Sequence, residues 1–273
     1  MDAVLVFDAD NTLWDTNAVF HRAQLDLLRV FIKAGYISDE ESQFEILRTV
    51  DRKLSSQLGC FEYDFGLLSA ALAHHCSGAS TIEEAVARAI DRRSENLDSE
   101  LIALIAEGYR TFQVGLRRVP TLYPDAASVL SSIRASRAPD IHIATILFSE
   151  GNPARLEHIL HAHEIRERSL FDEIILDIKS VEAFEAAKLA GLKHLPEGRD
   201  HAETLFVMTG DSLLRDIKYG NQAGFVTIYK PTSFLGRETP REKDEQPDII
   251  IRSLSELPSV LKEIGVPVNP LLE

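Results

Sequence analysis

The sequence predicts an α/β protein: a doubly wound parallel sheet, interrupted after its first strand by an all-helical insertion. From about residue 119 onward, short apolar runs alternate with amphipathic helical segments, which is typical of parallel strands joined by helices. Residues 16–118, in contrast, show helical periodicity almost without interruption and no convincing strand. We therefore expect a core of residues 1–15 and 119–273 and an inserted helical domain of residues 16–118.

The predicted strands are short and apolar, with helical segments between most of them. The first, at residues 3–8, belongs to the sheet by its character, although the insertion separates it from the rest. The others lie at residues 140–148, 172–178, 204–210, 225–229 and 248–251. In open parallel sheets, ligands bind beyond the carboxyl ends of the strands. The residues directly after each run are therefore the first places to look for chemistry.

The insertion carries signals for helix starts. Ser38 with Glu41, and Ser80 with Glu83, form the S-x-x-E pattern that opens helices. Each serine is therefore predicted to be the residue that caps a helix.

Composition and charge narrow the function classes. Hydrophobic residues make up 45% and charged residues 26% of the 273, as in ordinary globular proteins. The formal net charge of -14 disfavours nucleic acid and anionic membranes as partners. Cys60 and Cys76 are too few for a disulfide framework, and no signal segment or membrane-spanning run is apparent. We expect a soluble, cytoplasmic protein.

Two carboxylates stand at the end of the first predicted strand, Asp8 and Asp10. If the backbone stays near-extended between them, the two-residue period of a strand places both side chains on one side. Paired acids at this position suit catalysis, although acids after a strand also form turns or cap the next helix.

Polar residues follow the next two strands as well. Ser149, Glu150 and Gly151 come after the second run, where a hydroxyl and backbone N–H groups suit an oxyanion or phosphate cradle, or a simple helix cap. Lys179 follows the third run. It could supply a fixed positive charge for phosphate, or face solvent as lysines at strand ends usually do.

Two more acids, Asp211 and Asp216, follow the fourth strand. Acids at a helix N-terminus can be structural, but Asp211 would share the sheet edge with Asp8 and Asp10. Crowded carboxylates are costly without a cation, and Mg²⁺ is a hard cation that carboxylates bind. The sequence thus predicts a phosphoryl-transfer site, in which one carboxylate attacks phosphorus and a second handles the proton of the leaving group.

Together these motifs resemble the haloacid dehalogenase-like hydrolase superfamily, and within it the phosphatases with a helical C1 cap inserted after the first motif. DADNT (8–12) is similar to the DxDxT motif, Ser149 to the strand-end Ser/Thr, Lys179 to the motif lysine and GDSLLRD (210–216) to GDxxxxD. All four occur in order and span the core. The resemblance implies a Rossmann-like core and a cap domain.

The resemblance also implies a role for each residue. Asp8 would be the nucleophile that becomes an aspartyl-phosphate, and Asp10 would protonate the leaving oxygen and then activate water. The implied Mg²⁺ ligands are Asp8, the Asp10 backbone carbonyl, Asp211 and Asp216, the last as a ligand or as a residue that orients the others. Ser149 and Lys179 would hold the transferring phosphoryl group. The full set of substrate and phosphate contacts that we expect is Asp8, Ser149, Glu150, Gly151 and Lys179.

Three positions depart from the family pattern. Asn11 stands where many relatives have Gly, and Asn tolerates the same turn geometry. Glu150 stands where relatives often have Asn, so it either points away from the phosphate or binds a cationic or hydroxyl group of the substrate. Ser180 stands where relatives often have Pro, which makes Lys188 the alternative to Lys179.

Substrate identity is expected to depend on the cap, which could close over the site and exclude water. The candidates are the aromatic and acidic stretch at residues 60–65, and Arg117 with Arg118. For the stretch, packing within the cap is the alternative role, and for the arginines a solvated basic pair is the alternative.

The predicted function is a Mg²⁺-dependent phosphatase of a small phosphorylated metabolite. Asp10 favours phosphate over halide chemistry, because dehalogenases of the superfamily lack this acid, whereas an alkoxide leaving group needs a proton. A phosphomutase and a non-catalytic phosphometabolite-binding regulator are the alternatives. The expected partner is a small phosphate ester, not a nucleic acid or membrane, and the oligomeric state is left open.

Overall fold

The computed structural model describes residues 2–58, 64–92, 97–196, 203–232 and 239–269. Its internal contacts divide the chain into two compact units. The first, the core, comprises Met1–Asn17 and Val119–Glu273, and the second, the cap, comprises Ala18–Arg118.

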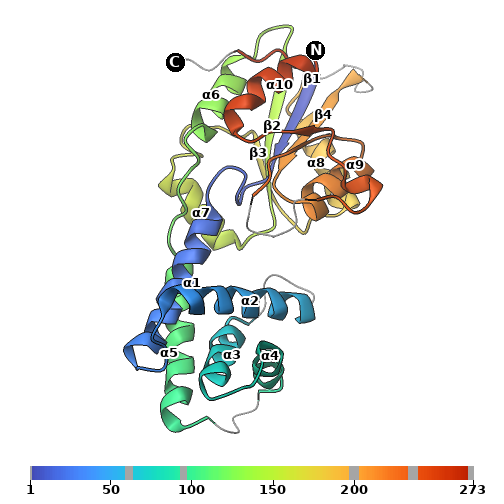
Figure 1. Cartoon of the computed structure of the whole chain (residues 1–273). Helices are drawn as coiled ribbons and strands as arrows, with labels where there is room; N and C mark the ends of the chain where they lie inside the picture. The colour runs from blue at the N-terminus through green and yellow to red at the C-terminus, as the bar shows by residue number, and fades with distance from the viewer. Residues whose placement is uncertain (1, 59–63, 93–96, 197–202, 233–238, 270–273) are drawn as a thin grey trace. The chain divides into compact units, whose positions relative to one another are not determined.

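The core is built on a parallel sheet, as predicted (Figure 1). In the described residues the sheet has six strands in the order β3-β2-β1-β4-β5-β6, and every neighbouring pair is parallel. The strands are β1 (Asp2–Phe7), β2 (His142–Ser149), β3 (Glu173–Leu176), β4 (Leu205–Gly210), β5 (Val226–Tyr229) and β6 (Ile249–Ile250). The predicted α/β fold class is confirmed, with strand ends that lie within two residues of the predicted ones.

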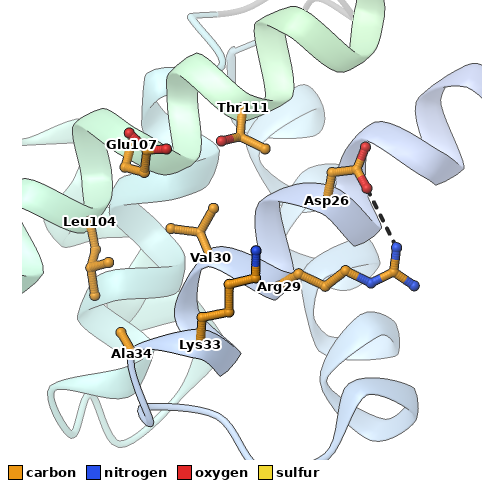
Figure 2. Close-up of a pocket in the computed structure, with 8 residues that line it drawn as sticks. All are labelled: Asp26, Arg29, Val30, Lys33, Ala34, Leu104, Glu107 and Thr111. Atoms are coloured by element: carbon orange, nitrogen blue, oxygen red, sulfur yellow. Dashed lines mark hydrogen bonds and ion pairs between the residues drawn. The ribbon is translucent and has the colours of Figure 1, made fainter.

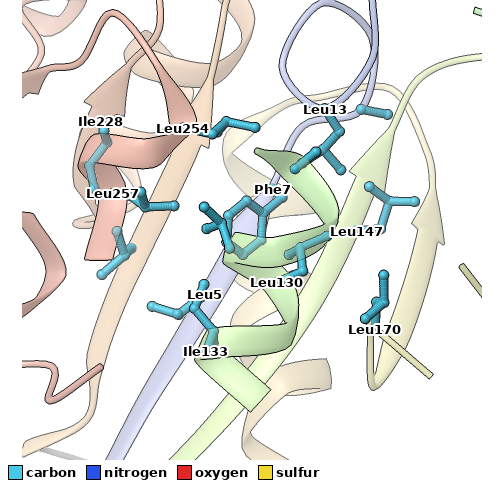
Figure 3. Packing of buried hydrophobic residues seen from close by; sticks show 14 of the residues in the cluster. Leu5, Phe7, Leu13, Leu130, Ile133, Leu147, Leu170, Ile228, Leu254 and Leu257 are labelled. Atoms are coloured by element: carbon cyan, nitrogen blue, oxygen red, sulfur yellow. The ribbon is translucent and has the colours of Figure 1, made fainter. Parts of the chain in front are cut away.

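Helices cover both faces of this sheet, because successive side chains of each strand point to opposite sides. Along β1, Ala3, Leu5 and Phe7 join one buried cluster, and Val4 and Val6 join another. Figure 3 shows Leu5 and Phe7 packed in the first cluster. Helices that contribute to it are α6 (Ala126–Ala135), α7 (Pro153–Ala162) and α10 (Leu257–Glu263). The second cluster includes residues of α8 (Val181–Leu192), and Tyr219 of α9 (Lys218–Gln222) packs against it.

The strand order reverses at the centre of the sheet. From β1 the chain proceeds through β2 to β3 at one edge, whereas β4, β5 and β6 extend from the other side of β1. In doubly wound sheets, ligands bind beyond the carboxyl ends of the strands at this reversal. The fold therefore directs attention to the residues that follow β1 and β4.

The cap is all-helical in the residues described. Its helices are α1 (Thr16–Lys33, which begins in the core unit), α2 (Glu40–Leu58), α3 (Gly66–Cys76), α4 (Ile82–Ile90) and α5 (Ser99–Leu116). They enclose their own apolar cluster, with Leu27, Phe31 and Leu72 fully buried. Among the described residues, no helix has both the length and the apolar character that crossing a bilayer requires.

Both predicted helix starts in the cap were one residue too early. The N-cap residue of α4 is Thr81, whose side chain accepts the Glu84 N–H at 3.1 Å. The Ser80 N–H instead donates to the Glu84 side chain. Helix α2 begins at Glu40, and Asp39 accepts the Glu41 N–H at 3.1 Å. In each case the neighbouring side chain supplies a better placed acceptor than the predicted serine.

Candidate active site

Asp8 and Asp211 lie on the two sides of the strand-order reversal. Asp8 directly follows β1, and its N–H still donates to the Thr209 carbonyl of β4 at 2.9 Å. Asp211 directly follows β4. Both side chains are buried, because each leaves a central strand of the sheet. Adjacent parallel strands thus bring together two carboxylates that are about 200 residues apart in the chain.

Asp216 completes a group of three acids, here called the acid cluster, with Asp8 and Asp211. Each contributes a carboxylate oxygen, and these oxygens lie within 4.8 Å of one another. Asp216 is held in a π-helical turn, Leu213–Ile217, where its Oδ2 accepts the Ser212 N–H at 2.8 Å. π-Helical turns are rare and occur frequently at functional sites.

Gly210 makes room for the acid cluster. A Cβ atom at this position would lie 2.3 Å from Cγ of Asp216, far inside van der Waals contact. The glycine of the GDSLLRD motif is therefore needed for the close approach of the Asp216 side chain to the backbone.

Lys179 supplies a cation to the acid cluster. Its ammonium group donates to Asp8 and, at 2.5 Å, to Asp216, and the side chain is buried. Lys188, the alternative lysine, instead donates to Glu185 and lies 5.3 Å from the centre of the Phe206 ring. The structure thus brings Lys179, and not Lys188, to the predicted site.

Burial and neighbouring charges together shift the pKa values of these groups. Burial raises the pKa of Asp8 to about 7, aided by Asp216 and opposed by the Lys179 charge. Burial, with the charge of Asp8, also raises the pKa of Asp211 well above its ordinary value. For Lys179 burial alone would lower the pKa, but the Asp216 and Asp8 charges outweigh it and leave the pKa raised.

One lysine does not neutralise three buried acids. Asp8, Asp211 and Asp216 present converging carboxylate oxygens, the ligand type that Mg²⁺ prefers. A divalent cation would offset the repulsion between them. The donor set therefore fits the hard cation that the sequence predicted.

Asp10 lies outside the acid cluster and has its own set of partners. Its Oδ1 accepts hydrogen bonds from Trp14 Nε1 at 2.9 Å, from the Thr16 hydroxyl and from Arg155 Nη1 at 3.2 Å. Its other oxygen, Oδ2, lies 3.7 Å from the point where a Cβ on Gly151 would stand. Oδ2 of Asp10 thus points toward the loop that follows β2.

That loop carries Ser149, Glu150 and Gly151. The buried Ser149 hydroxyl accepts the Gly151 N–H at 3.3 Å. Glu150 Oε1 accepts the backbone N–H of Lys179 at 2.6 Å and a bond from Arg215 Nη1 at 3.1 Å. Glu150 therefore ties together the turns after β2, β3 and β4, and its observed partners are groups of the protein itself.

The sequence reasoning missed Lys230, which follows β5 directly. Its buried ammonium donates to the Asn11 carbonyl at 2.9 Å and lies 3.8 Å from the centre of the Tyr123 ring. Asn11, the residue directly after Asp10, has a left-handed backbone with φ of 60°. The bond from Lys230 to its carbonyl therefore holds the turn that follows Asp10 in place. The rule that ligands bind beyond the carboxyl ends of parallel strands, applied to the predicted strand at residues 225–229, could have found Lys230.

Three further residues were also missed. Arg155 contacts Asp10, Arg215 contacts Glu150, and the Thr232 hydroxyl donates to Asp211 at 2.9 Å. Arg155 and Arg215 lie on helices and Thr232 in a loop, where no periodicity distinguishes them from other polar residues. Only the folded arrangement identifies their partners.

The cap residues proposed for specificity are only partly described. Residues 60–63 of the aromatic stretch lie outside the described residues, and the Phe65 ring packs 5.0 Å from the ring of Phe112. Arg118 donates to Asp26 at 2.6 Å within the cap, and Arg117 follows the last turn of α5.

A pocket of about 510 Å³ lies between α1 and α5 of the cap. Figure 2 shows its lining, with both acidic and basic side chains. The lining residues are Asp26, Arg29, Val30, Lys33, Ala34, Leu104, Glu107 and Thr111. Arg29 pairs with Asp26 at 3.5 Å and with Glu40 at 2.9 Å, so its charge is already partnered within the cap.

The sequence of this chain matches a known family and a known protein. The model of the haloacid dehalogenase-like hydrolase family matches residues 3–224. Glyceraldehyde 3-phosphate phosphatase from Methanopyrus kandleri is 24% identical over 268 residues, which cover 97% of this chain and 99% of the relative.

Two solved structures show a similar fold. A haloacid dehalogenase-like family hydrolase from Xanthomonas campestris has a TM-score of 0.57 at 19% identity, with 96% of each chain covered. The HAD-hydrolase YfnB from Bacillus subtilis, determined with bound magnesium, has a TM-score of 0.56 at 19% identity, covering 95% of this chain and 98% of its own. Because the family model matches most of its length, the chain belongs to the haloacid dehalogenase-like hydrolase family.

Proposed function

We propose that the chain is a Mg²⁺-dependent phosphatase, which hydrolyses a small phosphorylated metabolite through an aspartyl-phosphate on Asp8. The observation that carries this proposal is the buried acid cluster paired with Lys179, with the Asp10 carboxylate turned to the Ser149–Gly151 turn beside it. Membership of the family supports a hydrolase. The relative from Methanopyrus kandleri, a phosphatase of a small sugar phosphate by its name, supports the substrate class.

In the first half-reaction, a carboxylate oxygen of Asp8 attacks phosphorus while the bond from phosphorus to the ester oxygen breaks. Asp10 gives its proton to that departing oxygen, which leaves as an alcohol. In the second half-reaction Asp10 takes a proton from water as the water oxygen attacks phosphorus, and the bond to Asp8 breaks to release inorganic phosphate. Lys179 and Ser149 hold the phosphoryl oxygens throughout.

The acid cluster and the Asp10 backbone carbonyl would hold Mg²⁺. When bound, the cation supplies positive charge that stabilises the phosphoryl oxygens in the transition state. Glu150 is proposed to orient Lys179 through its backbone N–H, a role that its present partners suit better than contact with phosphate.

A screen of phosphate release from metabolite phosphates with Mg²⁺, beside Asp8→Asn and Asp10→Asn variants, tests the proposal. We expect release from at least one sugar phosphate or related ester, and loss of at least about a thousandfold in Asp8→Asn, since it lacks the nucleophile. Unchanged release in Asp8→Asn, or none from any substrate with the wild type, would refute it. Isomerised sugar phosphate without net phosphate release would identify a phosphomutase instead.

A further inference from the structure

The two oxygens of the Asp10 carboxylate are held unequally. Oδ1 accepts from Trp14 Nε1, the Thr16 hydroxyl and Arg155 Nη1. Oδ2 accepts from the same Arg155 nitrogen, at a longer 3.4 Å. A carboxyl oxygen has about two lone pairs available to donors, so three donors occupy Oδ1 fully. When Asp10 carries a proton, that proton therefore resides on Oδ2.

Oδ2 is also the oxygen turned toward the phosphoryl-binding turn. A Cβ on Gly151 would lie 3.7 Å from Oδ2 of Asp10 and 3.4 Å from the Ser149 hydroxyl oxygen. A proton on Oδ2 thus faces the place where the proposed ester oxygen leaves. A proton on Oδ1 would face the protein and could not reach a substrate.

Arg155 is the group that joins these contacts. It lies in the first turn of α7, which Asn152 anchors by accepting the Ala154 and Arg155 N–H groups. Its Nη1 contacts Asp10, and its Nη2 donates to the Thr16 hydroxyl at 3.3 Å. The planar guanidinium thereby holds the carboxylate, and the hydroxyl that also donates to it, through two nitrogens in one plane, a fixed geometry that a freely rotating ammonium group does not impose.

We propose that Arg155 is a positioning residue, which fixes the rotation of the Asp10 carboxyl so that Oδ2 presents its proton to the leaving group. The inference rests on the proposed phosphatase function and deepens it. As the bond from Asp8 to phosphorus forms and the bond to the ester oxygen breaks, the electron pair of the broken bond stays on that oxygen. The Oδ2 proton moves to the same oxygen, and Asp10 becomes a carboxylate.

This role predicts a dependence on the leaving group. An alkoxide needs the proton as it departs, whereas an activated phenolate leaves without it. The value of kcat/KM covers the steps up to departure of the leaving group, so it reports this proton transfer. Loss of positioning should therefore lower kcat/KM for alkyl phosphates far more than for activated aryl phosphates.

The experiment compares Arg155→Met, Arg155→Lys and Arg155→Gln with the wild type, on a series of aryl phosphates of decreasing leaving-group acidity and one alkyl phosphate. Arg155→Met should lose about thirtyfold in kcat/KM on the alkyl phosphate and less than about threefold on the most activated aryl ester. Arg155→Lys should keep most of the alkyl-phosphate loss, because an ammonium lacks the two coplanar nitrogens that orient Asp10 and Thr16 together. Thr16→Val, which removes the hydroxyl, should also lower kcat/KM more for the alkyl phosphate than for the activated aryl phosphates.

Arg166→Met is the matched control, since Arg166 is an exposed arginine of the core that pairs with Glu157 of α7 at 2.8 Å. Its leaving-group dependence should equal that of the wild type. If Arg155→Met unfolds, as thermal unfolding would reveal, Arg155→Gln replaces it.

Three outcomes would overturn the inference: an unchanged leaving-group dependence, an equal rise in KM for all substrates, which would mark Arg155 as a substrate-binding residue, or full rescue by Lys, which would mean that charge alone matters. A wild type that releases no phosphate refutes the proposed function instead, so the two failures are distinguishable.

Discussion

The core and the cap use charged residues in different ways. In the core, Lys179 and Asp216 form an ion pair in which both side chains are almost fully buried, at 3% and 0% exposure. In the cap, the pair of Lys53 and Glu83 is far more exposed, at 34% and 63%. Buried ion pairs are costly to break because the remaining charge stays desolvated, whereas solvent screens exposed pairs. The comparison predicts that substitutions of buried charges in the core alter both stability and chemistry, and that substitutions of exposed charges in the cap alter little.

The largest expected effect is that of Lys179→Met. The substitution leaves Asp8 and Asp216 without their cation, so we expect a loss of about 3–5 kcal/mol in the free energy of unfolding when EDTA is present. Phosphate release should fall at least about a thousandfold, because the phosphoryl oxygens lose a fixed positive charge. Urea unfolding and steady-state kinetics measure the two effects.

Lys53→Met is the matched control in the cap. Its partner Glu83 remains solvated, so the unfolding midpoint in urea should stay close to that of the wild type. Equal destabilisation by the two substitutions would contradict the contrast between core and cap.

The next prediction compares two glycines at close contacts. Gly210→Ala places a Cβ 2.3 Å from Cγ of Asp216, so Asp216 must move, and we expect at least about a hundredfold loss of activity. Gly115→Ala, in the cap, places a Cβ 2.7 Å from Cβ of Ala23, between α5 and α1. Overpacking of this kind costs about 1–3 kcal/mol, and it displaces no residue of the acid cluster.

Thermal unfolding and kinetics of both glycine variants separate these effects. Gly115→Ala should lower the unfolding temperature while it keeps activity within about threefold. A loss of activity in Gly115→Ala as large as in Gly210→Ala would show that cap packing matters to the chemistry as much as the acid cluster does.

The raised pKa of Asp8 predicts a pH dependence of stability in EDTA. Between its ordinary pKa of 3.8 and about 7, folded Asp8 binds a proton that the unfolded chain has lost. Stability should therefore fall as pH rises through this window. We expect a change on the order of 2 kcal/mol between pH 5 and 7.5, since each pKa unit corresponds to about 1.4 kcal/mol and the site relaxes when Asp8 ionises.

The difference in unfolding free energy between wild type and Asp8→Asn isolates this effect from the other titrating groups. If the unfolding free energies of the two proteins change in parallel between pH 5 and 7.5, the raised pKa of Asp8 is contradicted. Added Mg²⁺ should stabilise the wild type above pH 7 more than it stabilises Asp8→Asn, because the variant lacks one ligand charge.

Sequence reasoning was most successful where one periodicity and one rule sufficed. Alternating apolar runs predicted the parallel sheet, and the strand-end rule pointed to Asp8, Lys179 and Asp211, which the fold brings to one edge. Strand ends are readable because residue type changes abruptly there: residues 3–7 are all apolar, and the acid Asp8 follows at once.

Long-range side-chain partners could not be predicted in this way. Lys230 contacts Asn11 across 219 residues, and Arg155 contacts Asp10 across 145. Such contacts depend on rotamers and on loops whose path no periodicity encodes. The helix starts in the cap were missed by one residue because Asp39 and Thr81 are as suitable for capping as the serines beside them.

The smallest expected effect concerns Glu150. Its carboxylate in the core accepts two hydrogen bonds, as the carboxylate of Glu40 does in the cap. Glu150 accepts from the Lys179 N–H and from Arg215, whereas Glu40 accepts from Arg29 at 2.9 and 3.1 Å. Glu150→Ala should lower kcat/KM about tenfold, since the loss of a charged hydrogen bond frees the turn that carries Lys179. Glu40→Ala, which removes an exposed ion pair of the cap, should leave kinetics unchanged.

Glu150→Gln distinguishes positioning from substrate contact. A glutamine oxygen can still accept the Lys179 N–H, so this variant should stay within about threefold of the wild type. Inorganic phosphate should inhibit Glu150→Ala more weakly than the wild type, because the displaced Lys179 ammonium binds phosphate less well. If Glu150 instead binds a group on the substrate, both variants should raise KM alike while inhibition by phosphate stays the same, and the tie between the turns would then be incidental.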